Sequence, residues 1–293
     1  MSSFGTDRVP AWVLAVASML SVQLGAAISI SMFPEVGVAG TAWIRITIGA
    51  IGFVLIARPK YWTWSLAELR APMLLGVITG GMTLTFLGAI SRLPLGTAVA
   101  IEFLGPLSVA AIHSKSARAL AWPVLALIGV VLLTEPWQGE LDLIGIGYAL
   151  LAALGWALYI VVMQHVGDRF DGLDGLAISL PIAAVVTAIF GLPQAWGHFT
   201  WHVLGIAIIA AILLPLIPWS LELFALRRLN KAAFGTLMAL EPAIALAIGI
   251  VVLHQLPVVL QLVGIACVVV AGIAAERTGH RDEELPEFGV PHD

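Results

Sequence analysis

The chain has 293 residues, of which 60% are hydrophobic and 11% are charged, and its mean hydropathy is +1.02. Soluble domains carry about 25% charged residues, so this composition excludes a disordered chain and argues against a soluble enzyme. The formal net charge is −4, and nothing in the distribution of charge indicates nucleic-acid binding. A helix that crosses a bilayer uses about 20 apolar residues, and ten such helices with short loops account for the whole length.

Ten apolar segments follow one another along the chain, separated by charged residues, prolines and glycines. They cover about residues 11–30, 38–57, 71–90, 95–113, 119–134, 143–164, 174–193, 203–223, 233–253 and 257–275. The fifth is short, but Trp122 and Trp137 flank it as aromatic residues flank membrane interfaces. We predict an all-α polytopic membrane protein with ten transmembrane helices and with both termini on one side.

The first segment also has the charge and small residues of a signal peptide, with Arg8 before it and Gly25 to Ala27 as a cleavage site. However, its apolar run continues to Phe33, which is too long for the core of a typical signal peptide. We therefore interpret it as the first transmembrane helix.

The basic residues predict the orientation, because cytoplasmic loops keep an excess of Lys and Arg. With the N-terminus inside, Arg92 is the one external basic residue and Arg45 lies within a segment. The twelve others are then internal: Arg8, Arg58, Lys60, Arg70, Lys115, Arg118, Arg169, Arg227, Arg228, Lys231, Arg277 and Arg281. We expect a multi-pass protein of the cytoplasmic (inner) membrane with both termini cytoplasmic.

The C-terminal end is polar and acidic, and we expect residues 277–293 to form a disordered cytoplasmic tail. The one cysteine, Cys267, lies in an apolar segment. An intramolecular disulfide and a thiol-rich metal site are therefore excluded.

An internal repeat relates the fourth segment to the ninth. Gly96-Thr97 stands before Glu102 at the same spacing as Gly235-Thr236 before Glu241, 139 residues later. Weaker matches link the first segment to the sixth, through Leu24-Gly25 and Leu154-Gly155, and the fifth to the tenth, through 127–129 and 262–264. We therefore divide the chain into a first five-helix repeat, 1–137, and a second, 138–276.

A repeat with an odd number of crossings enters the membrane in the opposite direction in its second copy, so the repeats are inverted. Inverted repeats are a recurrent plan of secondary transporters, with the substrate site near the midplane between the two halves. An old gene duplication in another kind of membrane protein is the alternative.

Charged side chains inside a bilayer cost several kcal/mol, about 2.5 to 3.5 on insertion scales, and usually mark a functional interior. Arg45, Glu102, Glu222 and Glu241 qualify. Glu102 and Glu241 lie nearest the middle of their segments and are the first candidates for a substrate or proton site, with Arg45 as a partner of either. A static ion pair that joins helices is the structural alternative for Arg45, and a peripheral salt link is expected for Glu222.

Prolines follow both glutamates. Pro106 cannot donate to the carbonyl of Glu102, and Pro242 frees the carbonyl of Met238, so both helices are expected to kink. Pro215 and Pro218 predict further bends in the eighth segment. The alternative is that these prolines only shape helix packing.

Polar and aromatic residues on other segments are candidates for lining the same site. Thr79 and Thr83 share a helix face with Gly76 and Gly80, although a GxxxG spacing also indicates close helix packing. The remaining candidates are Gln23, Trp156 and Tyr159, for which a core or interfacial role is the alternative.

Signals for catalysis are weak. His198 and His202 are four residues apart but lack the glutamate of a zinc-protease motif. The sequence has no phosphate-binding loop, no dinucleotide fingerprint and no nucleophile elbow. We therefore expect neither an enzyme nor a cofactor nor a metal, and favour transport driven by a gradient. A membrane-embedded enzyme and a channel are the alternatives from other classes.

The segments from Ser91 to Pro106 and from Phe234 to Ala243 resemble the fourth and ninth helices of EamA-type members of the drug/metabolite transporter superfamily. The segment from Gly155 to Tyr159 resembles the sixth helix, and the likeness is strongest to the threonine and homoserine exporter branch. This resemblance implies a ten-helix inner-membrane exporter of amino acids or of another small solute, such as a drug, purine or sugar derivative. It also implies proton exchange and places Glu102 and Glu241 at the cavity, while monomer and homodimer stay open.

Overall fold

The computed structural model describes residues 10–113, 121–135, 142–167, 169–170, 173–219, 221 and 238–278. Within these ranges every regular element is helical, which confirms the predicted all-helical class. The α-helices are α1 (Ala11–Ile30), α2 (Phe33–Ala57), α3 (Leu66–Ile90), α4 (Leu95–Glu102), α5 (Leu104–His113), α6 (Ala121–Thr134), α7 (Leu143–Gly167), α8 (Asp174–Ala195), α9 (Trp201–Ala211), α12 (Glu241–Leu253) and α13 (Val259–Thr278). A 3-10 turn, η2 (Tyr61–Thr63), precedes α3, and a π-helical turn, η4 (Ile212–Leu216), follows α9.

Six helical segments among the described residues are long and apolar enough to cross a membrane: Trp12–Ile30, Phe33–Ala57, Leu66–Ile90, Leu143–Gly167, Asp174–Ala195 and Trp201–Trp219. Four shorter apolar helices accompany them: Leu95–Val109, Ala121–Thr134, Glu241–Leu253 and Val259–Ala274. The chain is therefore a multi-pass membrane protein. Some residues used in the sequence analysis lie outside the described ranges. They are Arg8, Lys115, Arg118, Trp137, Glu222, Arg227, Arg228, Lys231, Phe234, Gly235, Thr236 and the tail from residue 279 onward.

Local sequence sets several helix boundaries. Ser65 and Glu68 form a capping box at the start of α3, in which each side chain bonds the backbone N–H of the other. The Thr200 hydroxyl accepts the N–H of Val203 at the start of α9, at 3.1 Å. Arg58 ends α2 in the left-handed conformation, with φ at 50°.

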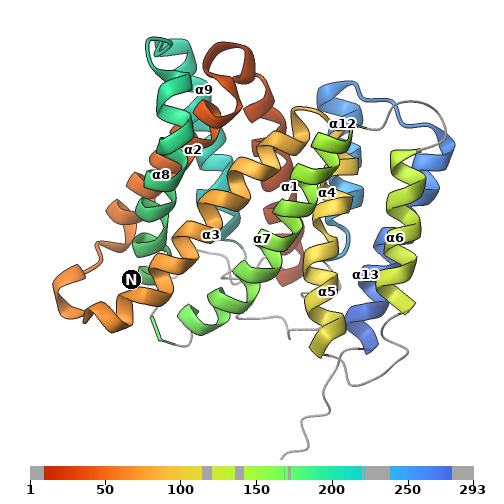
Figure 1. Ribbon diagram of the computed structural model, residues 1–293, viewed down its shortest axis with the longest axis horizontal. Helices are drawn as coiled ribbons and strands as arrows, with labels where there is room; N and C mark the ends of the chain where they lie inside the picture. Colours follow the sequence, from red (N-terminus) through yellow and green to blue (C-terminus); the bar gives the residue numbers. More distant parts are fainter. Residues whose placement is uncertain are drawn as a thin grey trace, which may run out of the picture.

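The helices form one bundle in which α2, α8 and α9 lie on one side and α6 and α13 on the other, with α1, α3, α4, α7 and α12 between them (Figure 1). The helix α2 packs on α8, α3 packs on α7 and α8, and α6 packs on α13. The helix α4 packs mainly on α12 and α7. Segments far apart in the sequence thus meet across the whole bundle.

Glycines permit the closest of these helix contacts. A Cβ on Gly129 of α6 would lie 2.6 Å from the carbonyl oxygen of Gly264 of α13, and a Cβ on Gly264 would lie 2.7 Å from the carbonyl oxygen of Gly129. Gly76 and Gly80 of α3 lie against α8, and a Cβ on Gly80 would lie 3.0 Å from Cβ of Val186. The GxxxG spacing on α3 therefore serves helix packing.

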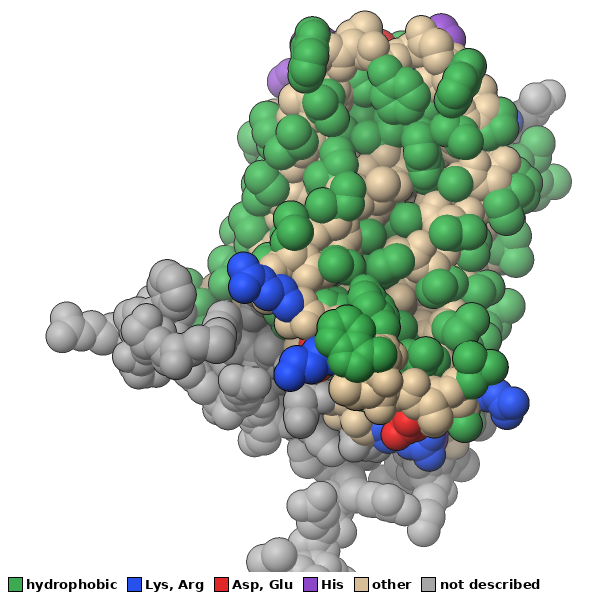
Figure 2. Space-filling model, turned by 90° about the vertical axis from the view of Figure 1, so that its left-hand side faces the viewer, with side chains coloured by type: hydrophobic (Ala, Val, Ile, Leu, Met, Phe, Trp, Pro, Cys, Tyr) green, Lys and Arg blue, Asp and Glu red, His purple; other side chains and the backbone are tan. Residues whose placement is uncertain are grey.

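The flank of the bundle that Figure 2 shows is covered by hydrophobic side chains. Lys and Arg side chains gather at one end of that face, and His side chains lie at the other. Exposed tryptophans mark both ends: Trp62 between α2 and α3 is 81% exposed, and Trp201 at the start of α9 is 89% exposed. An apolar band bounded by aromatic and charged residues is the surface that a bilayer requires.

Candidate functional site

Glu102 lies at a break in the membrane-spanning backbone. It is the last residue of α4, and α5 begins two residues later, at Leu104. Pro106 has no N–H to donate to the Glu102 carbonyl, which accounts for the interruption. The Glu102 side chain is buried, with 8% of the residue exposed. Among the described residues it makes no side-chain hydrogen bond or ion pair.

Glu241 lies at a second interruption, as the first residue of α12, with Pro242 following it. The residue is 5% exposed. Its Oε1 accepts a hydrogen bond of 3.2 Å from Nε2 of Gln23, which is itself 1% exposed on α1. A residue from the start of the chain therefore holds a carboxylate 218 positions later.

The two glutamates lie close enough for their charges to interact. Their helices approach because α4 packs on α12. A Cβ on Gly96 of α4 would lie only 3.1 Å from Cα of Leu246 of α12. The structure thus brings Gln23 into contact with Glu241 and places Glu102 on the helix that packs against α12. Two neighbouring carboxyl groups in an apolar interior are both ionised only when a cation compensates them. Without a cation, one of them holds a proton. Such a pair is suited to binding an ammonium group or exchanging protons.

Trp156 of α7 contacts the residue that follows Glu102. Its ring contacts the ring of Phe103 edge to face, with the centroids 6.1 Å apart. Phe103 directly follows Glu102 in the chain, so this ring contact joins α7 to the break between α4 and α5. Tyr159, one turn farther along α7, lies against Trp219, with the ring centroids 6.4 Å apart.

Arg45 is not paired with either glutamate. It is 2% exposed on α2, and its Nη1 donates to the hydroxyl of Ser29 on α1 at 3.1 Å. Ser29 in turn donates to the carbonyl of Gly25 at 2.7 Å. The Arg45 Nε has no hydrogen-bond partner. Ser29 holds the guanidinium near the end of α1, which keeps it from the Gln23 and Glu241 contact six residues back along that helix.

The threonines of α3 face the packed interior. Thr79 is 3% exposed and donates to the carbonyl of Leu75 in its own helix, at 2.8 Å. Thr83 is 6% exposed on the same face. The structure therefore does not bring Thr79 into hydrogen-bond contact with either glutamate.

The segment after α9 contains the third interruption. Leu214 leaves the helical conformation, with φ at −159° and ψ at 109°, directly before Pro215. The Leu213 carbonyl is left without its usual helical partner. It accepts a hydrogen bond of 2.7 Å from the Ser21 hydroxyl of α1. Ser18 of α1 donates to the carbonyl of Pro218 at 3.2 Å. Discontinuous helices of this kind are frequent at transporter sites.

Several of these polar contacts were not predicted from the sequence. Ser18, Ser21 and Ser29 are too common in membrane helices to stand out, although they lie close to one helix face. Gln194 of α8 is another case, because its Oε1 accepts the N–H of Ala39 at 3.0 Å. That N–H is freed by Gly37, where α2 breaks with φ at 72°. Only a long-range contact identifies such a role.

A cavity of about 270 Å³ lies at the end of α4 that is opposite Glu102. Its lining includes Thr97, Gly249, Gln255 and Gln261. The side chain of Gln255 caps α4, because its Oε1 accepts the N–H of Leu95 at 2.9 Å. The cap closes part of this end of the bundle.

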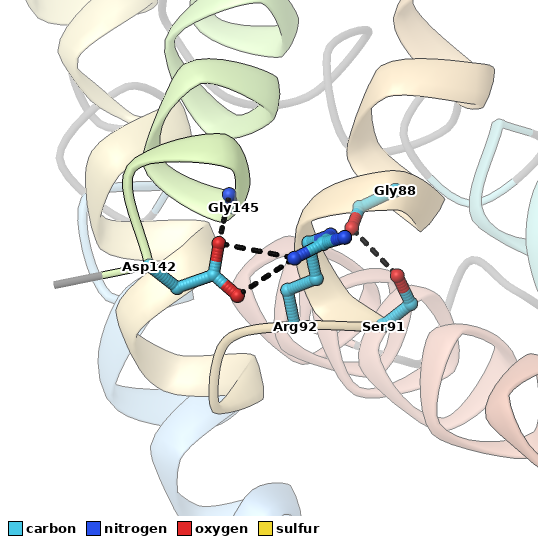
Figure 3. A network of polar contacts seen from close by, with 5 residues as sticks. All are labelled: Gly88, Ser91, Arg92, Asp142 and Gly145. Atoms are coloured by element: carbon cyan, nitrogen blue, oxygen red, sulfur yellow. Dashed lines mark hydrogen bonds and ion pairs between the residues drawn. The ribbon is translucent and has the colours of Figure 1, made fainter. Parts of the chain in front are cut away.

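An ion pair joins the start of α7 to the connection between α3 and α4 (Figure 3). Arg92 lies 3.0 Å from Asp142, whose Oδ1 also accepts the N–H of Gly145 at 2.8 Å. The backbone N–H of Gly145, followed by the interaction with Arg92, lowers the pKa of Asp142 below its ordinary value. Ser91 donates to the carbonyl of Gly88 beside the pair.

The two histidines four residues apart do not form a metal cluster. His202 lies 3.2 Å from Glu35 of α2 through its Nδ1, and the backbone N–H of His198 bonds the carbonyl of Ala195. In the part of the chain that the structure describes, no group of three His, Cys, Asp or Glu side chains has metal-binding geometry.

Comparison with known proteins identifies the family. Residues 143–275 match the model of the EamA-like transporter family. The "Threonine/homoserine exporter RhtA" of Escherichia coli (strain K12) is 36% identical over 292 residues, which cover 97% of this chain and 98% of that protein. The protein of the same name from Salmonella typhimurium (strain LT2) is 35% identical over 294 residues, with the same coverage of both chains. "Uncharacterized transporter YvbV" of Bacillus subtilis (strain 168) is 24% identical and covers 85% of each chain.

Proposed function

Because this chain belongs to the EamA-like transporter family, we propose that it is a secondary exporter of small amino acids such as threonine and homoserine. The observation that carries the proposal is the 36% identity to a threonine/homoserine exporter along 97% of the chain. The site geometry agrees with it, since buried carboxylates with an amide suit an ammonium-bearing solute. The fold alone does not fix the cargo, because one fold serves many solutes.

We propose further that the protein consists of two inverted five-helix repeats. The helix contacts support this, because they occur in matched pairs. The contact of α1 with α12 has a counterpart in that of α7 with α4, and the contact of α1 with α9 has one in that of α7 with α3. The reciprocal approach of Gly129 and Gly264 also supports it, since these glycines align in the two repeats.

Alternating access would then come from movement of one repeat against the other. The helix interruptions at Glu102, Leu214 and Glu241 offer places where the backbone can bend. Protons entering the cell would supply the energy, because a buried carboxyl takes up and releases a proton when its surroundings change.

The cytoplasmic membrane and a cytoplasmic location of both termini belong to the same proposal. Arg58, Lys60 and Arg169 follow helix ends and Arg70 lies near the start of α3, whereas Arg92 lies beyond the other end of α3. Cytoplasmic loops keep an excess of Lys and Arg, so the cationic end is the cytoplasmic one.

Counterflow in proteoliposomes tests the function directly. Vesicles loaded with unlabelled threonine should accumulate labelled threonine, and a panel of amino acids, purines and sugar derivatives inside the vesicles should establish the specificity. Chemical analysis of the released solute separates a carrier from an enzyme. A preference for a solute without an ammonium group would contradict the proposed cargo, and a chemically altered product would contradict transport.

Export in cells provides the second test. In a strain without its own exporters, the wild-type protein should confer tolerance to threonine or homoserine, and Glu102→Gln and Glu241→Gln at equal expression should not. Glu68→Gln is the matched control, because Glu68 is an exposed carboxyl at the start of α3. Wild-type tolerance in both buried-site variants would refute the site assignment.

A further inference from the structure

The two glutamates of the proposed site have different hydrogen-bond surroundings. Glu241 accepts a hydrogen bond from the Gln23 amide, whereas Glu102 has no side-chain partner among the described residues. The repeat alignment puts Ala153 of α7 in the place of Gln23, since Leu24 aligns with Leu154. A methyl group cannot donate a hydrogen bond. An amide donor therefore stabilises the negative charge of one carboxylate but not that of the other.

Their positions on the backbone differ in the same direction. Glu241 is the first residue of the 13-residue helix α12, and the N-terminal end of a helix favours a negative charge. Glu102 is the last residue of α4, and the C-terminal end disfavours a negative charge. The immediate start of α5 reduces the second effect without reversing the order of the two sites.

The charges near Glu102 do not change this order. The helices packed against α4 are α3, α5, α6, α7, α12 and α13. Their described titratable side chains are Glu68, Arg70, Tyr148, Tyr159, His165, Glu241 and Cys267. Of these, only Glu241 exerts a charge effect on Glu102. No described cation compensates Glu102, because Arg45 is bonded to Ser29 instead.

We propose that the two acids divide the work of exchange: Glu102 carries the coupling proton, and Glu241, held by Gln23, binds the ammonium group of the cargo. This assignment rests on the proposed function. The repulsion between the carboxylates links the two events. A proton on Glu102 removes a negative charge that attracts the ammonium, and a bound ammonium at Glu241 favours the ionised form of Glu102. Each ligand thus weakens the other, as exchange requires.

In both loaded states one positive charge compensates the glutamate pair. Two carboxylates with one proton carry a charge of −1, and two carboxylates with the ammonium group of the cargo also carry −1, while the carboxylate of the zwitterionic cargo adds a further charge that the pair does not compensate. The empty, fully ionised site carries −2 in an apolar interior, which is the costly state. The proton moves from external water to Glu102 after the cargo leaves, and from Glu102 to cytoplasmic water before the next cargo binds.

Two assays on the same proteoliposomes test the division. Counterflow of labelled threonine measures exchange without net proton movement, and uptake driven by an imposed pH gradient measures coupling. Glu102→Gln is neutral like the protonated form, so it should raise the KM for threonine but keep counterflow within about threefold of wild type at saturating threonine. It should also lose the pH dependence of counterflow and lose gradient-driven uptake. Glu241→Gln should lose both activities. Gln23→Leu should raise the KM for threonine about tenfold or more and keep gradient-driven uptake, since it removes a hydrogen bond to a charged group.

Controls make each outcome decisive. Glu68→Gln should match wild type in both assays, and Glu102→Asp, which keeps a carboxyl, should retain gradient-driven uptake. Three outcomes would overturn the division of roles between Glu102 and Glu241. Two concern monodisperse Glu102→Gln, namely loss of counterflow or retained gradient-driven uptake, and the third is an unchanged KM for threonine in Gln23→Leu. If Glu102→Gln is not monodisperse, the Gln23→Leu and Glu102→Asp results decide. Wild-type protein without threonine counterflow would instead refute the proposed function, and wild-type counterflow without gradient-driven uptake would refute proton coupling.

Discussion

The contact between Ser29 and Arg45 is the most direct target for a stability measurement, because both residues are almost wholly buried. Ser29→Ala removes the hydroxyl that accepts a hydrogen bond of 3.1 Å from Nη1 of Arg45. When a buried charged donor loses its hydrogen-bond partner, the folded state loses about 1–3 kcal/mol of stability. Nε of Arg45 already has no hydrogen-bond partner. We expect the variant to lose about that amount of unfolding free energy.

Arg45→Met removes the charge together with its need for a partner. Replacing a buried charge by an apolar side chain of similar size is often neutral or stabilising, so the effect of Ser29→Ala should shrink to within about 0.5 kcal/mol in the Arg45→Met background. Ser31→Ala is the matched control, since Ser31 is exposed and bonds only the nearby carbonyl of Ile28.

Equilibrium unfolding in mixed detergent micelles, followed by tryptophan fluorescence, gives the free energies for the four proteins of this cycle. An interaction energy of about 1 kcal/mol or more between the two substitutions is expected. Equal costs of Ser29→Ala in the two backgrounds would refute the reasoning that the hydroxyl compensates the guanidinium.

Three further predictions concern other contacts. Gly129→Leu should cost about 1–3 kcal/mol or more by overpacking, because even its Cβ would lie 2.6 Å from a backbone oxygen, whereas Gly147→Ala, which enters open space, should be neutral in the same unfolding assay. The pKa of Asp142 is lowered in the folded state, so its ion pair with Arg92 should stabilise the protein fully at neutral pH. This contribution should be lost as the pH falls below 3.8, the ordinary pKa of an aspartate. The same acid dependence of the unfolding midpoint in the Arg92→Ala variant would contradict this prediction. Gln255→Ala leaves the first N–H of α4 without its cap and should cost about 1 kcal/mol; unchanged stability would show that water replaces the amide.

Hydropathy predicted the helices well, because a bilayer demands about 20 apolar residues for each crossing and leaves little choice of secondary structure. Most of the predicted segments coincide with helices within a few residues, including α1 at 11–30. The fourth segment is divided into α4 and α5 at Phe103, close to the kink that Pro106 predicted. The repeat directed attention to Glu102 and Glu241, which lie buried on the packed helices α4 and α12.

The partners of polar side chains were much less predictable. The sequence suggested Glu102 or Glu241 for Arg45, and the structure gives it Ser29. Such a pairing depends on the rotation and height of two neighbouring helices, which an apolar pattern does not encode. The break of α2 at Gly37 was missed for a similar reason, since glycine in a membrane helix more often indicates packing than a bend.

The exchange of an amino acid for a proton at the buried glutamate pair is the central claim. Its most direct test records threonine efflux and internal pH in the same proteoliposomes. Outward movement of threonine should acidify the interior in proportion to the efflux, and Glu102→Gln should abolish the acidification. Threonine efflux without proton entry in the wild-type protein would contradict the account.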